Sequence, residues 1–304
     1  MTERRFARFS WLRAGLLSCC VAAATVAVTS CAHGVTAPAG AAPAGVVVPQ
    51  GHASRPGDRA RSDRVRMLAV RNQFTACERR IEHGRGRVPT MAIVGASYTA
   101  GVGPSSAVLS WAVDLARTLR WDAAIYGVPG AGFARTGTDG QGPMTRMLTD
   151  EQLPALSPSL VIVQAGYDDS RVPAGVQRQQ VLRTIDQIRA EAPQARIGLV
   201  TVFTSPARPI PARLFLTDRT IVAAARAADP NAIIMDPLTG QWTYQHANEG
   251  LHPTAAGDAW IAQKVAGILG AHGVHADPPA PAGAAPVVCD IGVPARPADR
   301  GARA

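Results

Sequence analysis

The sequence has few residues that could build a metal centre or hold a nucleotide. Its seven histidines and five cysteines form no cluster at the spacing of metal ligands. The glycine-rich stretch from Gly95 to Gly103 lacks the Gly-Lys-Ser/Thr ending of a nucleotide-binding loop and the spacing of a dinucleotide fingerprint. We therefore expect no metal and no cofactor.

Acidic residues are scarce beside the basic ones, 22 against 31, which gives a formal net charge of +9 over 304 residues. Ten arginines lie between Arg55 and Arg87, ahead of the main apolar segments. This placement argues against a basic nucleic-acid groove, so we expect no nucleic-acid partner. It is compatible with attraction to an anionic membrane or cell-wall surface.

The N-terminus has the order of a secretion signal. Several arginines precede an apolar run from Trp11 to Val28, and Thr29-Ser30-Cys31 follows. This ending resembles the bacterial lipobox, in which the cysteine receives diacylglycerol after cleavage. We expect export, with the membrane as partner through a lipid on Cys31 in the cell envelope; an uncleaved membrane anchor is the alternative.

Cysteine is scarce, and the five cysteines fall into three groups. Cys19 and Cys20 leave with the signal and Cys31 is lipidated, so only Cys77 and Cys289 remain in an oxidising space. We expect these two to form a disulfide that closes a very long loop. Two unpaired thiols are the alternative.

Apolar runs alternate with helical patterns through the middle of the chain. Continuous apolar runs, typical of strands buried on both faces, cover Met91–Val94, Ala123–Tyr126, Leu160–Gln164, Ile197–Val202 and Ala232–Met235. Helical periodicity covers Val108–Leu119, Gln177–Ala192, Ala212–Ala228 and Ala255–Leu269. Since parallel strands need crossover helices, we predict an α/β fold with a doubly wound parallel sheet. Ligands of such sheets bind at the carboxyl ends of the strands.

The flanks differ from this middle part in composition. We divide the chain into a signal peptide (1–30), a Pro/Ala-rich tether (31–59), an N-terminal helical flank (60–88), the main α/β domain (89–272) and a Pro/Ala-rich C-terminal tail (273–304). In the tail, only Val287 to Ile291 has a pattern that could order.

Two of the strand ends carry residues suited to nucleophilic catalysis. Gly95-Ala96-Ser97-Tyr98 follows the first strand, and a turn of small residues exposes a serine that needs a base and amide donors. Glu249-Gly250-Leu251-His252-Pro253 precedes the last helix. There an acid three residues ahead of the histidine can orient its ring. A serine that only caps the next helix, or a surface His-Pro turn, is the alternative.

Together these blocks resemble the SGNH hydrolases, also called GDSL esterases, over about residues 90 to 271. Gly95-Ala96-Ser97 matches the family's Gly-Asp-Ser, Gly127-Val128-Pro129-Gly130 its oxyanion glycine, Gly166-Tyr167-Asp168-Asp169 its Gly-x-Asn-Asp, and Glu249 to His252 its Asp-x-x-His. The resemblance implies a three-layer α/β/α sandwich with a flavodoxin-like, five-stranded parallel sheet.

The resemblance also assigns roles to these residues. Ser97 is the nucleophile, His252 the base and Glu249 the orienting acid. The oxyanion donors are the amides of Ser97 and Gly130, together with position 168.

Position 168 departs most from the family. Asp168 replaces an asparagine that donates to the oxyanion, and an ionised carboxylate there would repel the oxyanion by about 4 kcal/mol at 4 Å and an effective dielectric of 20. Asp168 is therefore expected to be protonated, with a pKa raised by burial and by Asp169, or to turn away. We assign Tyr98, Tyr167 and Asp169 to substrate binding.

The sequence thus predicts a serine esterase that hydrolyses carboxylic esters through an acyl-serine intermediate. No long apolar lid segment is visible, so we favour small acyl or acetyl esters, on cell-envelope glycans or lipids. Two alternatives stay open: a catalytically impaired binding lipoprotein of the same fold, and an envelope acyltransferase.

Overall fold

The computed structural model describes residues 56–84, 88–103, 110–204, 209–248, 250–278 and 285–291. They all belong to one unit of the chain, Ala53–Ala304. The expected signal peptide, the lipidation site Cys31, the tether up to residue 55 and the acid Glu249 lie outside the described residues, whereas residues 56–59 of the tether belong to a helix. Within the described ranges, no helix has both the length and the apolar character needed to cross a membrane.

The described strands form one parallel sheet of six, in the order β5-β4-β3-β1-β2-β6. Their bounds are β1 (Thr90–Gly95), β2 (Asp122–Gly127), β3 (Leu160–Gln164), β4 (Arg196–Val200), β5 (Ile233–Met235) and β6 (Val288–Asp290). The central strands are buried along almost their whole length, as their continuous apolar runs predict. The first five strands have the order 2-1-3-4-5, which confirms the flavodoxin-like arrangement.

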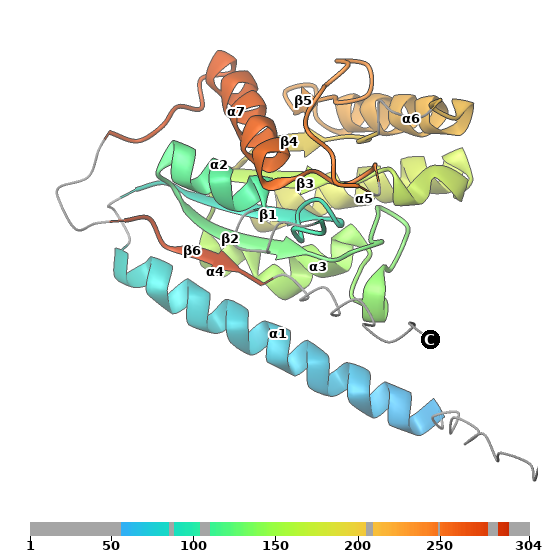
Figure 1. The fold of residues 1–304 in the computed structure, drawn as a ribbon. Helices are drawn as coiled ribbons and strands as arrows, with labels where there is room; N and C mark the ends of the chain where they lie inside the picture. The colour runs from blue at the N-terminus through green and yellow to red at the C-terminus, as the bar shows by residue number, and fades with distance from the viewer. Residues whose placement is uncertain are drawn as a thin grey trace, which may run out of the picture. The chain divides into compact units, whose positions relative to one another are not determined.

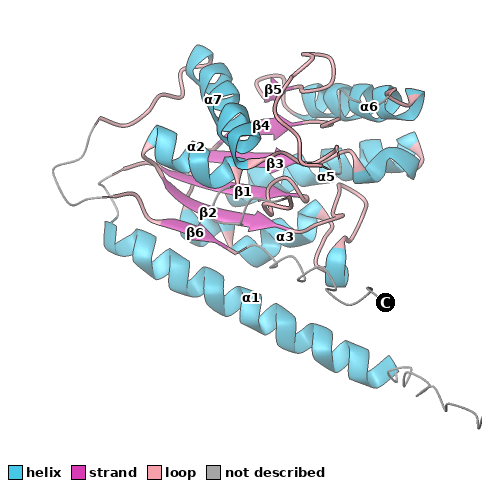
Figure 2. Cartoon of the chain, in the orientation of Figure 1, coloured by secondary structure: helices cyan, strands magenta, loops and turns pink. Residues whose placement is uncertain are grey.

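Helices cover both faces of this sheet and make the predicted three layers (Figures 1 and 2). One face packs against α2 (Trp111–Leu119) and α7 (Ala255–Ala271), with Trp111 and Ile261 in its core. The other face packs against α3 (Met144–Glu151), α4 (Leu153–Leu156), α5 (Ala174–Glu191) and α6 (Ala212–Ala228). The sequence analysis missed α3 and α4, which are short.

The N-terminal flank forms one long helix, α1 (Pro56–Gly84), close to the predicted range. Phe74, Cys77 and Ile81 lie on its buried side, at 1–3% exposure. The ring of Phe74 meets Tyr126 of β2 edge to face, with the ring centroids 5.2 Å apart. The flank is therefore part of the hydrophobic core at its C-terminal half.

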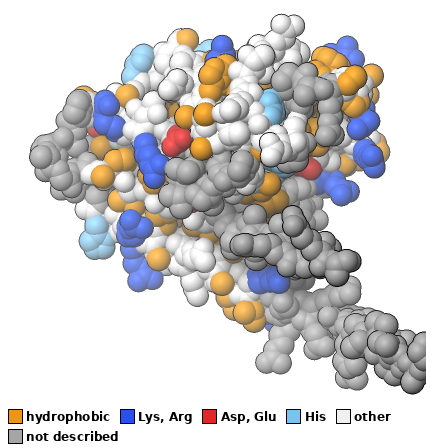
Figure 3. Space-filling model, viewed as in Figure 1, with side chains coloured by type: hydrophobic (Ala, Val, Ile, Leu, Met, Phe, Trp, Pro, Cys, Tyr) orange, Lys and Arg blue, Asp and Glu red, His pale blue; other side chains and the backbone are white. Residues whose placement is uncertain are grey.

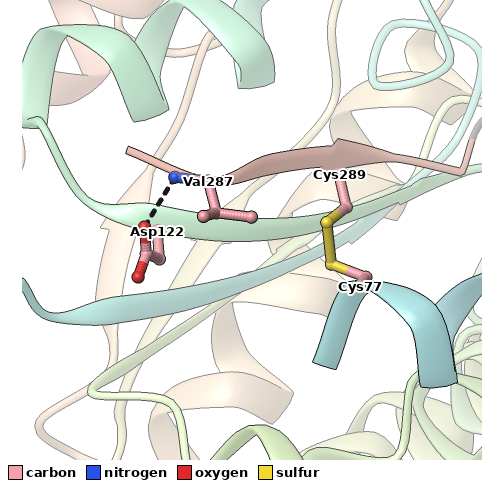
Figure 4. Close-up of a disulfide and its surroundings, with 4 residues drawn as sticks. All are labelled: Cys77, Asp122, Val287 and Cys289. Carbon is pink, nitrogen blue, oxygen red and sulfur yellow. Dashed lines mark hydrogen bonds between the residues drawn. A yellow bond between two sulfur atoms is a disulfide. The ribbon is translucent and has the colours of Figure 1, made fainter. Parts of the chain in front are cut away.

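The sheet has six strands where five were predicted, because the C-terminal segment adds β6 beside β2. The carboxylate of Asp122 accepts a hydrogen bond from the amide of Val287, 2.6 Å away, at the start of this segment (Figure 4). The predicted disulfide between Cys77 and Cys289 is present, with the Cα atoms 5.9 Å apart, and it links α1 to β6. It confirms the pairing of these two cysteines.

Basic side chains are spread over the surface. On the face drawn in Figure 3, Lys and Arg form separate groups with few acidic residues among them. Some arginines are used within the fold: Arg66 of α1 forms an ion pair with Asp139, 2.6 Å apart. Among the described residues on this face, the basic groups do not join into one stripe.

Candidate active site

The turn after β1 holds Ser97 at the carboxyl end of the sheet. Gln164, the last residue of the neighbouring strand β3, accepts hydrogen bonds through Oε1 from the amide of Ala96 and the hydroxyl of Thr99, both at 3.0 Å. The turn also lies tight against β2, because a Cβ on Gly127 would come within 2.3 Å of the backbone nitrogen of Ala100. Only glycine allows this close approach.

The histidine comes from the loop between β5 and α7. This loop is closed by a backbone hydrogen bond of 2.8 Å from Ala247 to the carbonyl of His252 and by a bridge between His246 and Pro253. Thr254 then caps α7, where its side chain accepts from the amide of Gly257. The cap fixes where the helix begins and so where His252 leaves it.

The two predicted partners meet across the end of the sheet. Nε2 of His252 lies 2.9 Å from Oγ of Ser97, although 155 residues separate them in the chain. Ser97 and His252 are both partly exposed, whereas the residues on either side of Ser97 are buried. This is hydrogen-bond distance between a hydroxyl nucleophile and an imidazole base, at a place that a substrate can reach.

The loop after β2 brings Gly130 to the same end of the sheet. The amide of Val128 donates to the carbonyl of Gly95, 2.9 Å away, which ties this loop to the end of β1. Gly130 has φ of 76°, a left-handed conformation that favours glycine. Among the hydrogen bonds of the described residues, none is donated by the amide of Ser97 or of Gly130. Both amides are therefore available to a ligand, as an oxyanion site requires.

Asp168 and Asp169 follow β3 in a short 3-10 helix, Asp168–Arg171. Burial, and then the charge of Asp169, raise the pKa of Asp168 to about 6, against an opposing effect of Arg135. The carboxyl group therefore keeps its proton up to a pH well above the range in which an aspartate usually ionises. A protonated carboxyl can donate a hydrogen bond to an oxyanion, whereas the ionised form cannot.

Asp169 holds the loop that follows Gly130. Its side chain is fully buried and accepts hydrogen bonds from the amides of Phe133 (2.8 Å) and Ala134 (3.0 Å). Burial raises the pKa of Asp169, and these two amides oppose that rise. Since both carboxylate oxygens serve the backbone, this geometry argues against the predicted contact of Asp169 with substrate.

The other two residues assigned to substrate binding differ in exposure. Tyr98 is 2% exposed and Tyr167 is 37% exposed. Burial argues against a direct substrate contact of Tyr98, while Tyr167 has surface to offer beside Asp168. The third member of the expected triad, Glu249, lies outside the described residues, so its role stays a prediction.

The sequence analysis missed Gln164 as the residue that fastens the nucleophile turn. A signal was present, because Gln164 is a polar residue at the end of an apolar strand that is buried on both faces. Buried amides are retained where they satisfy the backbone, and here the partner is the turn that carries Ser97. No group of three or more potential metal ligands occurs in the described part of the chain.

Comparison with known proteins agrees with this geometry. The sequence pattern of the GDSL-like lipase/acylhydrolase family matches residues 93–260, more than half of the chain. The chain belongs to this family. It is a serine hydrolase that acts on esters, and the matched range contains both Ser97 and His252.

Individual relatives of this GDSL-family hydrolase are distant. The GDSL lipase Rv0518 of Mycobacterium tuberculosis is 26% identical over 198 residues, which cover 60% of this chain and 82% of that protein. A carbohydrate esterase family 2 enzyme with a carbohydrate binding domain, from Corynascus thermopiles (Myceliophthora fergusii), is 21% identical at a TM-score of 0.50 and covers 61% of this chain and 67% of its own.

A second solved structure is similar to this chain to about the same extent. It is a family two carbohydrate esterase from Clostridium thermocellum in complex with cellohexaose, with 17% identity and a TM-score of 0.51. The match covers 61% of this chain and 65% of that one, so the chain spans less than two thirds of this neighbour. At these identities the solved structures show a shared fold.

Proposed function

We propose that this protein cleaves carboxylic esters through an acyl-serine intermediate, with Ser97 as nucleophile and His252 as base. The distance of 2.9 Å between Oγ of Ser97 and Nε2 of His252 is the observation that supports this most directly. The serine hydroxyl attacks the ester carbonyl carbon while Nε2 takes its proton, and the carbonyl oxygen becomes an oxyanion. His252 then gives the proton to the leaving alkoxide, and an acyl-serine remains.

Water completes the cycle by the same route. His252 takes a proton from the water as the water attacks the acyl carbon, and it returns that proton to Oγ of Ser97 as the acid leaves. The amides of Ser97 and Gly130 hold the oxyanion in both steps, and Asp168 adds a third donor while it is protonated. Glu249 orients the imidazole in this scheme.

For the substrate we propose small acyl or acetyl esters on cell-envelope glycans or lipids. The names of the relatives, a lipase and two carbohydrate esterases, span this range. For the location we propose export and attachment to the membrane by a lipid on Cys31, which the N-terminal sequence supports. The disulfide between Cys77 and Cys289 supports export, since such bonds persist in oxidising compartments.

Labelling with a fluorophosphonate probe, together with hydrolysis of p-nitrophenyl acetate, tests the mechanism. We expect the wild-type protein to react with the probe. Ser97→Ala should not be labelled, and its kcat/KM should be lower by at least about 10³-fold. Ser159→Ala is the matched control. Ser159 is exposed and directly precedes β3, at the end of that strand away from Ser97. Unchanged hydrolysis in Ser97→Ala would refute the proposal. If an added glycan becomes acylated instead, the reaction is acyl transfer and not hydrolysis.

Metabolic labelling tests the proposed anchor separately. Cells that express the wild-type chain are expected to incorporate radiolabelled palmitate into it, whereas Cys31→Ser abolishes the incorporation and releases the protein from the membrane fraction. Equal labelling of both chains would contradict a lipid on Cys31.

A further inference from the structure

Tyr98 follows the nucleophile directly, and its ring is fixed by packing. It is 2% exposed and stacks on Phe203, with the ring centroids 4.2 Å apart and the planes 7° from parallel. Tyr244 meets it edge to face on another side, at 6.4 Å between centroids. A ring held in this way places its hydroxyl group at a defined point.

That hydroxyl reaches the loop that carries the base. It donates a hydrogen bond of 2.5 Å to the carbonyl of Leu251, the residue before His252. It also lies 3.0 Å from the hydroxyl of Tyr244. Because Tyr98 gives its one proton to Leu251, its oxygen can only accept in the bond with Tyr244, whose hydroxyl also lies 3.4 Å from the carbonyl of Thr204. The result is a chain of bonds from Tyr244 through Tyr98 to the backbone beside His252.

We propose that Tyr98 is a positioning residue that sets the distance between the nucleophile and its base. This inference rests on the proposed function of Ser97 and His252. Tyr98 is covalently joined to Ser97, and its hydroxyl bonds to the residue before His252. This bridge, Tyr98 to Leu251, is therefore a second link between the segments of Ser97 and His252, beside the bond of 2.9 Å between the two catalytic groups. A displacement of about 1 Å between reacting groups can cost about 100-fold in rate.

A second feature explains why the bridge is needed. Leu251 and His252 are partly exposed, and the described backbone bonds of their loop are made mostly within the loop itself, such as those from Gly250 to Ala247 and from Ala247 to His252. The hydroxyl of Tyr98 ties this loop to the nucleophile turn. Phenylalanine at position 98 would keep the packing but would lose the tie.

Tyr98→Phe and Tyr126→Phe form a matched pair for the test. Tyr126 of β2 is also buried, and its hydroxyl also donates a hydrogen bond, to Oε1 of Gln141 at 3.0 Å. Each variant therefore deletes one buried, bonded hydroxyl group and should lose similar stability. We expect kcat on p-nitrophenyl acetate to fall about tenfold in Tyr98→Phe with KM nearly unchanged, since the loss lies in alignment and not in binding. Tyr126→Phe should keep the wild-type kcat.

The outcomes separate this inference from the proposed function. If Ser97→Ala is inactive while Tyr98→Phe keeps the wild-type kcat, the positioning role is overturned and the mechanism stands. If Ser97→Ala keeps its activity, the mechanism itself fails. An equal loss of kcat in both tyrosine variants would also overturn the proposal, because it would reflect loss of stability alone.

Tyr244→Phe decides the matter if Tyr98→Phe does not fold. It removes the donor to Tyr98 and thereby weakens the bond from Tyr98 to Leu251, because hydrogen bonds in a chain strengthen one another. We expect about a threefold fall in kcat and an equally slower fluorophosphonate reaction, with KM unchanged. A wild-type kcat in Tyr244→Phe would then overturn the proposal.

Discussion

Ser97 and His252 lie within hydrogen-bond distance, yet the chain holds them by different means. The turn of Ser97 is held by two neighbouring strands: it is bonded to Gln164 of β3 and packs closely against Gly127 of β2. The loop of His252 closes on itself, and the hydroxyl of Tyr98 bonds to its backbone. The nucleophile therefore belongs to the sheet, whereas the base belongs to a loop.

This difference separates stability from activity. Changes that weaken the sheet around Ser97 should lower the free energy of unfolding together with the rate. Changes in the segment from Ala247 to His252 should lower the rate with little effect on stability, because the backbone hydrogen bonds of that segment lie mostly among its own residues. The predictions below, from the largest expected effect to the smallest, test where this separation holds.

Removal of the disulfide should affect stability alone. In the double variant Cys77→Ser with Cys289→Ser, we expect the free energy of unfolding to fall by about 4 kcal/mol, because the bond closes a loop across 212 residues of sequence separation. Chemical denaturation measures the loss, and kcat at 25 °C should be close to the wild-type value. A large loss of kcat in folded protein would show that α1 and β6 also position the site.

Loss of the acceptor on Gln164 should affect both properties. Gln164→Met keeps the volume of the side chain but leaves the Thr99 hydroxyl without its partner and removes one acceptor of the Ala96 amide. We expect about 2 kcal/mol less stability and a lower kcat. Thermal unfolding and ester hydrolysis measure the two effects on the same sample. Full stability with a reduced kcat would contradict this, because the nucleophile turn would then affect the rate alone, as is expected of the histidine loop.

Asp168→Asn should raise activity in alkaline solution. The pKa of Asp168 is raised to about 6, so the carboxyl is protonated below that pH and repels the oxyanion above it. Asparagine stays neutral, and the ratio of kcat/KM of the variant to that of wild type should therefore grow as pH rises through 6, to about tenfold at pH 8. A ratio below one at pH 8 would show that the carboxylate itself is needed.

The same substitution has a defined effect on stability. Because the folded-state pKa of Asp168 exceeds the ordinary aspartate pKa of 3.8, the folded chain binds more protons than the unfolded chain between the two values. This contribution to stability is present below the unfolded value and is lost as pH rises to about 6. Asp168→Asn should flatten that decline. Asp169→Asn is the contrasting control, since it sets an amide group against the amides of Phe133 and Ala134 and should destabilise the fold.

The cap of α7 should give the smallest effect. Thr254→Ala removes the hydrogen bond from the amide of Gly257, 3.2 Å, and should cost about 1 kcal/mol of stability. Since Thr254 follows His252 by two residues, we also expect a small fall in kcat. Thermal unfolding and steady-state kinetics measure both, and an unchanged Tm would show that the cap has no part in fixing the helix.

The sequence predicted the sheet and the pair Ser97–His252, because each depends on a local pattern. Apolar runs locate the strands, and the parallel topology brings the strand ends together whatever lies between them. The disulfide followed from the small number of available cysteines. The segment Val287–Ile291 was predicted to order but was not placed in the sheet, because its partner β2 lies far away in the sequence.

Side-chain contacts across the site could not be predicted in the same way. Tyr98 and Asp169 were assigned to substrate binding, yet the hydroxyl of Tyr98 bonds to the histidine loop and the carboxylate of Asp169 bonds to the backbone of Phe133 and Ala134. Adjacency in sequence says which residue is near the site. Only the three-dimensional packing says whether its side chain faces the substrate or the protein.

A double-mutant cycle on Ser97→Ala and His252→Ala tests the central claim most directly. If the two side chains act as one unit, each single variant should lose about as much kcat/KM on p-nitrophenyl acetate as the double variant, because either loss alone disables the proton transfer. Losses in the two single variants that simply add in the double variant, or a His252→Ala protein with wild-type activity, would contradict the pairing of this serine with this histidine.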